Sequence, residues 1–264
     1  MMKNFLRSLV PSSLQVPVKY MINKWRSQLE AELKLLPFLV KRGETVIDIG
    51  GNRGQYTYAL WQLGSKVQVF EPNPVCSRVL MAWASSKNSV SVHQVGLSDK
   101  SGEAVLHIPV DEFGNEHDAS GSLGDGSAAY TRDEIVPISS LDSFTFDKVT
   151  FVKIDVEGHE YSVLKGGSKF FQRQRPTILV EIEQRHNNRP VDEVFDLIES
   201  WGYSGFFLRG NSLMKLEKFE TNRDQNIDDF DSNSENYINN FLFLSEERLL
   251  KRCYAELFSA WGEK

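Results

Sequence analysis

The chain has very little cysteine and no long apolar run. Its 264 residues include two cysteines, Cys76 and Cys253, which stand far apart and outside any metal-binding spacing. This excludes a disulfide scaffold and indicates a reducing compartment. No apolar stretch approaches the roughly 20 residues that a membrane-spanning helix needs. The N-terminus, interrupted by Pro11, is too short in its apolar part for a secretory signal. We therefore expect a cytoplasmic protein.

The chain also has fewer basic residues than acidic ones, 30 Lys/Arg against 36 Asp/Glu. The formal net charge of −6 gives no reason to expect affinity for nucleic acid. The charge is uneven, because residues 1–42 hold eight Lys/Arg against two acids, whereas residues 217–235 hold seven acids against two bases. Such runs are usually solvated surface. The alternative for the basic N-terminal segment is peripheral contact with an anionic membrane. Nothing in the sequence indicates an oligomeric state.

Short β-branched runs alternate with amphipathic segments along most of the chain. Strands are expected at 45–50, 66–71, 89–95, 149–155, 177–183, 203–208 and 238–244, with an added strand at 103–110. Helices are expected at about 20–38, 54–63, 74–85, 160–171, 190–201 and 245–261. This alternation predicts a mostly parallel α/β sheet with helices on both faces, ending in an antiparallel pair of strands. We divide the chain into an N-terminal helical segment, 1–43, and one α/β domain, 44–264.

One long segment matches no packed element. Residues 111–133 are rich in glycine, serine and aspartate. A loop of this length inside a compact domain is usually functional or disordered. We expect a mobile loop that closes over a substrate, with Tyr130 offering an aromatic face to a sugar ring.

The first strand ends in a glycine-rich turn that carries an acid, Asp48–Gly54. Small residues let the backbone turn sharply and let a ligand approach closely. In open α/β sheets, ligands bind beyond the carboxyl ends of the strands. The dinucleotide fingerprint G-x-G-x-x-G is absent here. A cofactor without a pyrophosphate, such as S-adenosylmethionine, suits an acid beside the glycines. Glu71, at the end of the second strand, could accept hydrogen bonds from a ribose diol of either cofactor.

Three motifs in this order resemble the FkbM family of S-adenosylmethionine-dependent methyltransferases. They are Asp48-Ile49-Gly50-Gly51-Asn52-Arg53-Gly54, Phe70-Glu71-Pro72-Asn73 and Lys153-Ile154-Asp155-Val156-Glu157-Gly158-His159-Glu160. The likeness extends from about residue 44 to 245 and includes Leu164-Lys165-Gly166, Leu179-Val180-Glu181-Ile182 and Asn240-Phe241-Leu242-Phe243. Gly51 departs from the family pattern, which more often has alanine there.

The resemblance implies a class I (Rossmann-like) methyltransferase fold whose seven-stranded sheet has the order 3-2-1-4-5-7-6. It also implies methylation of a hydroxyl group, often on a sugar or a polyketide-type product, in a glycan, glycolipid or secondary metabolite. Carried over by residue, the methionine part of the cofactor would contact Asp48, Gly50, Asn52 and Gly54. Glu71 would hold the ribose, and Gly96 and Leu97 would lie near adenine.

The catalytic residues implied by the resemblance are Asp155, Glu157 and His159. A hydroxyl needs a base, or a metal that lowers its pKa, before it attacks a methyl group. We favour His159 as the base without a metal. Mg²⁺ held by Asp155, Glu181 and Glu183 is the alternative that we do not favour.

Each of these assignments has a purely structural alternative. His159 could simply begin the following helix, and Glu157 and Glu160 could be there for the helix dipole. Lys153 could form an internal ion pair with Asp155. His186 has no spacing to other histidines that suggests a site.

Two other function classes stay open from the sequence. One is a nicotinamide-dependent oxidoreductase with a degenerate fingerprint. The other is a non-catalytic binding member of the same fold. Stabilisation by S-adenosylhomocysteine but not by NAD would separate the methyltransferase from the oxidoreductase.

Overall fold

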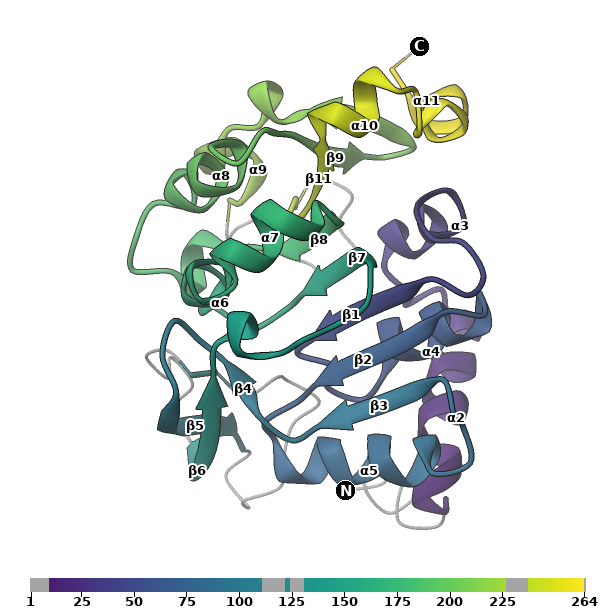
Figure 1. Ribbon diagram of the computed structural model, residues 1–264, viewed down its shortest axis with the longest axis vertical. Helices are drawn as coiled ribbons and strands as arrows, with labels where there is room; N and C mark the ends of the chain where they lie inside the picture. Colours follow the sequence, from purple (N-terminus) through teal and green to yellow (C-terminus); the bar gives the residue numbers. More distant parts are fainter. Residues whose placement is uncertain (1–9, 111–121, 124–130, 227–236, 264) are drawn as a thin grey trace.

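The structure is a computed structural model that describes residues 10–110, 122–123, 131–226 and 237–263. Its main sheet has eight strands in the order β10-β9-β11-β8-β7-β1-β2-β3 (Figure 1). Their bounds are β1 Thr45–Ile49, β2 Lys66–Phe70, β3 Val90–His93, β7 Val149–Ile154, β8 Thr177–Glu181, β9 Tyr203–Arg209, β10 Ser212–Lys215 and β11 Asn240–Ser245.

The sheet confirms the expected class I methyltransferase order. The five strands from β3 to β8 are parallel, and β11 lies antiparallel to both β8 and β9. Read from β3 to β9, the order is the implied 3-2-1-4-5-7-6. The eighth strand, β10, was not predicted, and it forms an antiparallel hairpin with β9.

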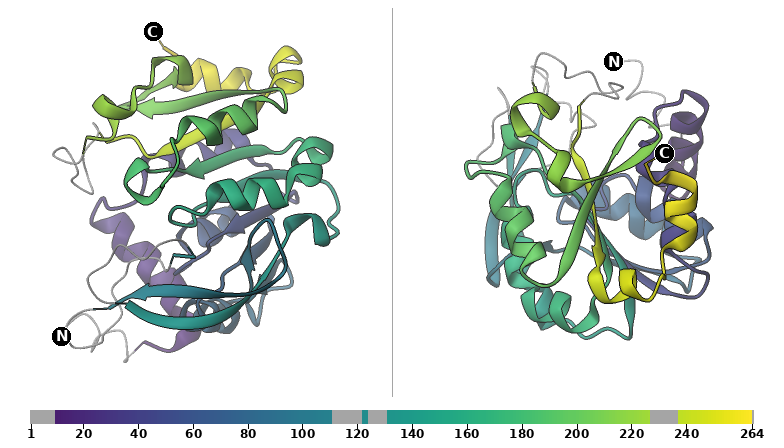
Figure 2. Two further views of the ribbon diagram at one scale, coloured as in Figure 1. Left: turned by 90° about the vertical axis from the view of Figure 1, so that its left-hand side faces the viewer. Right: turned by 90° about the horizontal axis from the view of Figure 1, so that it is seen from above.

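Helices cover both faces of the sheet (Figure 2). The bounds of the α-helices are α2 Ser12–Trp25, α3 Leu36–Leu39, α4 Gln55–Gln62, α5 Pro74–Ala84, α6 Glu160–Gly166, α7 Ser168–Gln174, α8 Asp192–Glu199, α9 Thr221–Asp224, α10 Glu246–Leu250 and α11 Ala255–Trp261. Short 3-10 turns occupy Ala31–Lys34, Leu141–Ser143, Gln184–His186 and Leu216–Lys218. One apolar core joins the sheet to α2, α3, α4, α5 and α11, and a second joins it to α6, α7 and α8.

The expected added strand at 103–110 exists but belongs to a second sheet. It is β5, Gly102–Pro109, which pairs with β6, Thr131–Ser139, and β6 also pairs with β4, Gly96–Leu97. The predicted loop 111–133 lies largely outside the described residues. Its last three residues, 131–133, are the start of β6, so the predicted end of the loop is three residues too late.

Three predicted helices are each interrupted. The helix expected at 20–38 is wrong in its bounds, because α2 begins at Ser12 and ends at Trp25, and Ser27 has a φ of 55° that no α-helix accommodates. The helix expected at 160–171 changes direction at Gly167 between α6 and α7. The helix expected at 245–261 is divided near Arg252, whose φ is also 55°.

Two residue types favoured as N-caps, asparagine and serine, precede α5 and α10, and only the first caps its helix. The Asn73 side chain accepts hydrogen bonds from the backbone N–H groups of Val75 and Cys76, as an N-cap followed by proline predicts. Ser245 stands at the N-cap position of α10, where serine is favoured, but its hydroxyl is buried and makes no cap bond. Among the described residues, no helix combines the length and apolarity needed to cross a membrane.

Candidate active site

Two adjoining pockets open at the carboxyl ends of the central strands, which point to the left in Figure 1. The first is here called the apolar pocket. It is lined by Ile49, Gly50, Asn52, Phe70, Glu71, Pro72, Asn73, Cys76, Gly96, Leu97, Leu106, Leu123, Asp155 and Val156. The second, here called the acidic pocket, is lined by Lys19, Glu30, Asp48, Gly50, Gly51, Asn52, Arg53, Gln55, Tyr56 and Asp155. Gly50, Asn52 and Asp155 lie at the junction of the two.

The turn after β1 depends on Gly50. Its φ is 81°, and a Cβ built on it would lie 1.7 Å from the carbonyl oxygen of Asp155. Only glycine therefore lets β1 and β7 end side by side here. The Gly50 N–H donates to the Phe70 carbonyl oxygen at 2.8 Å, which ties the turn to β2 as well. Gly54, with a φ of 83°, ends the turn where α4 begins.

Glu71 is buried where β2 ends, and both its carboxylate oxygens accept backbone hydrogen bonds. Oε2 accepts from the Asn52 N–H at 2.6 Å and Oε1 from the Asn73 N–H at 2.7 Å. Each oxygen keeps a second lone pair for a ligand donor. Burial raises the pKa of Glu71 to about 7, although the two backbone bonds oppose this. The side chain is thus held rigidly as a hydrogen-bond acceptor facing the apolar pocket.

The apolar pocket is closed by the small sheet. The predicted residues Gly96 and Leu97 line it from β4, and Leu106 lines it from β5. Leu123, from inside the predicted loop, completes this wall. Neither Leu106 nor Leu123 could be recognised from the sequence, because an apolar residue in a strand or loop gives no sign of which ligand it will meet.

The acidic pocket has a floor of buried polar side chains. The Thr57 hydroxyl donates to Asp48 Oδ2 at 2.5 Å, and burial raises the pKa of Asp48 to about 6. The Tyr56 hydroxyl donates to Glu30 Oε2 at 2.7 Å. Glu30 comes from the N-terminal segment, for which the sequence offered no family signal, and so it was missed.

Lys153 is fully buried beneath this floor. Its Nζ donates to Asn240 Oδ1 at 2.8 Å and lies 3.9 Å from Glu181 Oε2. Burial disfavours its charge, but the surrounding carboxylates, Asp155 foremost, outweigh burial and raise its pKa. Lys153 is therefore an internal counter-charge for the acids around it.

The three predicted catalytic residues are not gathered at one point. Asp155 lies at the junction of the pockets, and burial raises its pKa to about 6. Neither Glu157 nor His159 lines either pocket. His159 stands at the N-cap position of α6 without capping it, and its Nε2 is 3.0 Å from Ser98 Oγ. Burial lowers the pKa of His159.

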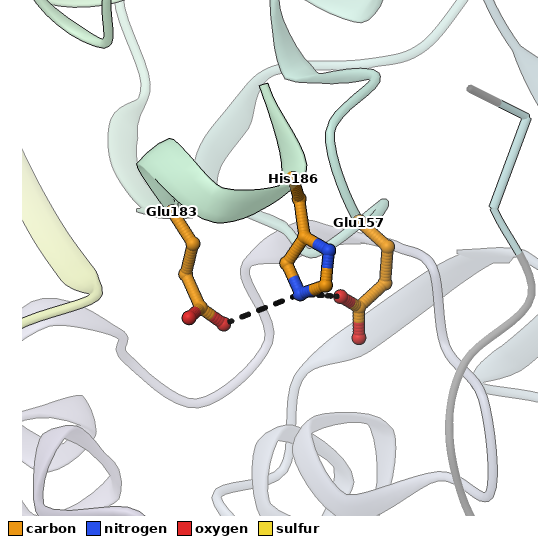
Figure 3. Close-up of side chains that lie close together, drawn as sticks. All are labelled: Glu157, Glu183 and His186. Atoms are coloured by element: carbon orange, nitrogen blue, oxygen red, sulfur yellow. Dashed lines mark ion pairs between the residues drawn. The ribbon is translucent and has the colours of Figure 1, made fainter. Parts of the chain in front are cut away.

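Glu157 instead lies beside His186, which comes from the loop after β8 and also approaches Glu183 (Figure 3). His186 Nε2 lies 3.2 Å from Glu157 Oε2 and 3.9 Å from Glu183 Oε1. Burial, together with the nearby carboxylates of Asp155 and Glu183, raises the pKa of Glu157 to about 8. The sequence could not reveal His186 as part of a site, because its partner Glu157 is 29 positions earlier and on another strand end.

Glu181 and Glu183 do not converge with Asp155 on one ion position. The Asn239 amide donates to Glu181 Oε1 at 2.8 Å, on the side of β8 where Lys153 lies. Glu183 accepts from Arg185 Nε at 2.6 Å and from the Tyr237 hydroxyl at 2.7 Å. Although burial opposes it, these bonds lower the pKa of Glu183.

The chain is similar to known methyltransferases in sequence and in fold. A family model described as the methyltransferase FkbM domain matches residues 48–204. The 2-O-methyltransferase NoeI of Sinorhizobium fredii (strain NBRC 101917 / NGR234) is 26% identical over 207 residues, which cover 72% of this chain and 85% of that protein. A crystal structure of methyltransferase FkbM from Methylobacillus flagellatus KT aligns with a TM-score of 0.52 at 15% identity and covers 89% of this chain. The match covers 55% of the solved chain, so this protein spans about half of its length.

The matched family segment begins at Asp48 and includes Glu71, Asp155 and the loop after β8. It covers more than half of the 264 residues and contains most of both pockets. The sheet has the class I order, and the solved FkbM structure shares this fold. The chain belongs to the FkbM methyltransferase family and is an S-adenosylmethionine-dependent methyltransferase.

Proposed function

We propose that this enzyme methylates a hydroxyl group, and that the acceptor is a sugar in a glycan, glycolipid or secondary metabolite. The observation that carries this proposal is the carboxylate at the junction of the two pockets, Asp155, with Glu157, Glu183 and His186 beyond it at the ends of β7 and β8. Carboxylates and imidazoles are suited to holding the several hydroxyls of a sugar. The name of the relative from Sinorhizobium fredii, a 2-O-methyltransferase, supports O-methylation.

The two pockets fit the two halves of the cofactor. The diol of an adenosine ribose could donate to the free lone pairs of Glu71, while Gly96 and Leu97 accommodate adenine in the apolar pocket. The amino-acid end of the cofactor would lie against Asp48, Gly50 and Asn52 in the acidic pocket, which Gly54 does not line. When bound, S-adenosylmethionine supplies the methyl group.

Asp155 is the residue that we propose to face the acceptor. An alcohol becomes a good nucleophile as its proton leaves, and a base works best when its pKa is near the working pH. The Asp155 pKa of about 6 meets this condition. Positioning the hydroxyl against the methyl carbon supplies much of the remaining acceleration. Mg²⁺ bound by Asp155, Glu181 and Glu183 is not proposed, because among the described residues these three carboxylates do not converge on one ion position.

The choice of base can be tested by substitution. Because Asp155 lines both pockets and His159 lines neither, we expect Asp155→Asn to lower kcat by about 10²–10⁴-fold, the usual contribution of a positioned base. We expect His159→Ala to lower it less than tenfold. The measurement is transfer of labelled methyl from S-adenosylmethionine to a panel of oligosaccharides. A loss of 10²-fold or more in His159→Ala, with Asp155→Asn nearly unaffected, would return the role of base to His159.

The product identifies the chemistry. A methyl ether formed on a sugar hydroxyl survives mild alkali, whereas a methyl ester is hydrolysed. We expect the label to stay on the sugar after alkaline treatment. Label released by alkali, or found on nitrogen, would contradict the proposal of O-methylation while leaving the enzyme a methyltransferase.

A further inference from the structure

We propose that Glu157, Glu183 and His186 form a binding site for a divalent transition-metal ion. Each side chain offers one ligand atom, and the three atoms lie within 4.8 Å of one another (Figure 3). Glu157 comes from the loop after β7, and the other two come from the loop after β8. The loops after β7 and β8 thus bring together two oxygen donors and one nitrogen donor.

The spacing suits a shared ion. Two ligand atoms that are each about 2.1 Å from one metal ion lie about 3.0–3.4 Å apart when the angle between them is 90–109°. The 3.2 Å between His186 Nε2 and Glu157 Oε2 falls within this range. The 3.9 Å between His186 Nε2 and Glu183 Oε1 needs only a small side-chain rotation.

The loop after β7 and the loop after β8 are in close backbone contact at Gly158. Gly158 has a φ of 89°, and a Cβ on it would lie 2.2 Å from the carbonyl oxygen of His186. This close contact places Glu157 directly beside His186. The Asn187 side chain bridges the same loops, because its amide donates to Glu160 Oε2 at 3.3 Å and to the Glu183 carbonyl oxygen at 3.0 Å.

The Glu183 carboxylate is held in place by hydrogen bonds from Arg185 and Tyr237. Arg185 Nε and the Tyr237 hydroxyl both donate to Oε2, and the Oε1 atom that faces His186 receives the longer Arg185 bond of 3.1 Å. Ligating carboxylates in metal sites are usually held by such outer hydrogen bonds. Glu183 is 4% exposed, whereas His186 and Glu157 are 23% and 24% exposed. The site is therefore anchored on one side and open on the other.

The donor set selects the kind of ion. Imidazole suits first-row transition metals, and carboxylates suit the harder ions of that group. Two carboxylates and one imidazole favour Mn²⁺ or Zn²⁺ over Mg²⁺ or Ca²⁺, which prefer oxygen ligands throughout. With three protein ligands, positions stay open for a substrate oxygen.

The role of the ion rests on the proposed function. The ion would bind an acceptor hydroxyl and lower the pKa of that hydroxyl. Its ligand Glu157 is two residues from Asp155 in sequence. This differs from the metal-independent catalysis that the sequence favoured.

Metal binding can be measured without any acceptor. We expect the purified, EDTA-treated protein to bind one Mn²⁺, detected as loss of the free-ion signal in electron paramagnetic resonance. His186→Ala and Glu157→Gln should each weaken binding by more than about tenfold, as changes in a metal site do. His107→Ala is the matched control, because His107 also pairs with a carboxylate, Asp133, but the described part of the chain offers this pair no third ligand. S-adenosylhomocysteine affinity reports whether each variant is folded.

The outcomes separate the metal site from the proposed function. Tight Mn²⁺ binding that His186→Ala and Glu157→Gln weaken, and His107→Ala does not, supports the site. Absence of Mn²⁺ and Zn²⁺ binding, or binding that survives both substitutions, overturns it. If methyl transfer to sugars is insensitive to EDTA and Mn²⁺ does not bind, the metal site fails while the proposed O-methylation stands. If Mn²⁺ binds as expected but no sugar is methylated with it present, the proposed acceptor class fails while the site stands.

Discussion

Gly50→Ala is expected to destabilise the protein by about 2–5 kcal/mol and to abolish measurable binding of S-adenosylhomocysteine. A non-glycine residue at a left-handed φ costs about 1–2 kcal/mol, and Gly50 has a φ of 81°. The new Cβ would also lie 1.7 Å from the Asp155 carbonyl oxygen. Relieving such overpacking typically costs a further 1–3 kcal/mol or so. Because Gly50 and Asp155 both lie where the two pockets meet, any movement that relieves the clash also displaces the proposed cofactor site.

The control for this prediction is Gly43→Ala. Gly43 has nearly the same φ, 86°, but nothing lies within 4 Å of a Cβ built there. The control therefore carries the conformational cost alone, and we expect a loss of about 1–2 kcal/mol with unchanged ligand affinity. Urea unfolding and calorimetry measure the two effects. Equal destabilisation of the two variants, with binding retained in Gly50→Ala, would contradict the account of the turn.

Glu71→Gln is expected to weaken S-adenosylhomocysteine binding by about 10–100-fold. Hydrogen bonds to a charged group contribute about 1.5–3 kcal/mol each, and tenfold in affinity corresponds to about 1.4 kcal/mol. Glutamine has one acceptor oxygen, so it also cannot accept from both the Asn52 and Asn73 N–H groups. Calorimetry measures the loss. Glu103→Gln, an exposed glutamate on β5, should leave affinity unchanged, and affinity unchanged in Glu71→Gln would remove Glu71 from the cofactor site.

The same residue predicts how binding depends on pH. Burial raises the pKa of Glu71 to about 7 in the free protein, so the carboxylate form predominates above pH 7. Ribose hydroxyls donate to that form, so ligand affinity should fall as pH drops from 8 to 6, and Glu71→Gln should flatten that slope. Stability has the opposite sign, because the raised pKa favours the protonated folded state. The contribution of Glu71 to the free energy of unfolding is therefore fully present below its unfolded pKa, near pH 4, and is lost as pH rises through 7.

The central part of the fold could be predicted because its physical signals are local. The central parallel strands β1, β7 and β8 are buried runs rich in β-branched residues, and Asp48, Glu71 and Asp155 stand at strand ends that the parallel order brings to one edge. The helix breaks at Ser27 and Arg252 could not be predicted, because neither residue type signals a left-handed backbone.

The acceptor side of the site was less predictable for a different reason. Glu30 reaches the acidic pocket from the N-terminal segment through its bonds to Gln55 and Tyr56. His186 reaches Glu157 through a backbone contact that only Gly158 permits. Both depend on side chains distant in sequence meeting at one place. The resemblance pointed to His159, which is close to Asp155 in sequence, but its imidazole faces Ser98 instead.

The most direct test of the central claim is a crystal structure of the protein with S-adenosylhomocysteine. We expect both ribose hydroxyls within hydrogen-bond distance of the Glu71 carboxylate. We also expect adenine against Gly96 and Leu97, and the amino-acid end against Asp48 and the glycine turn. The sulfur should then lie at the junction of the pockets, beside Asp155. A ribose bound away from Glu71, or a sulfur facing away from Asp155 and the ends of β7 and β8, would contradict the account.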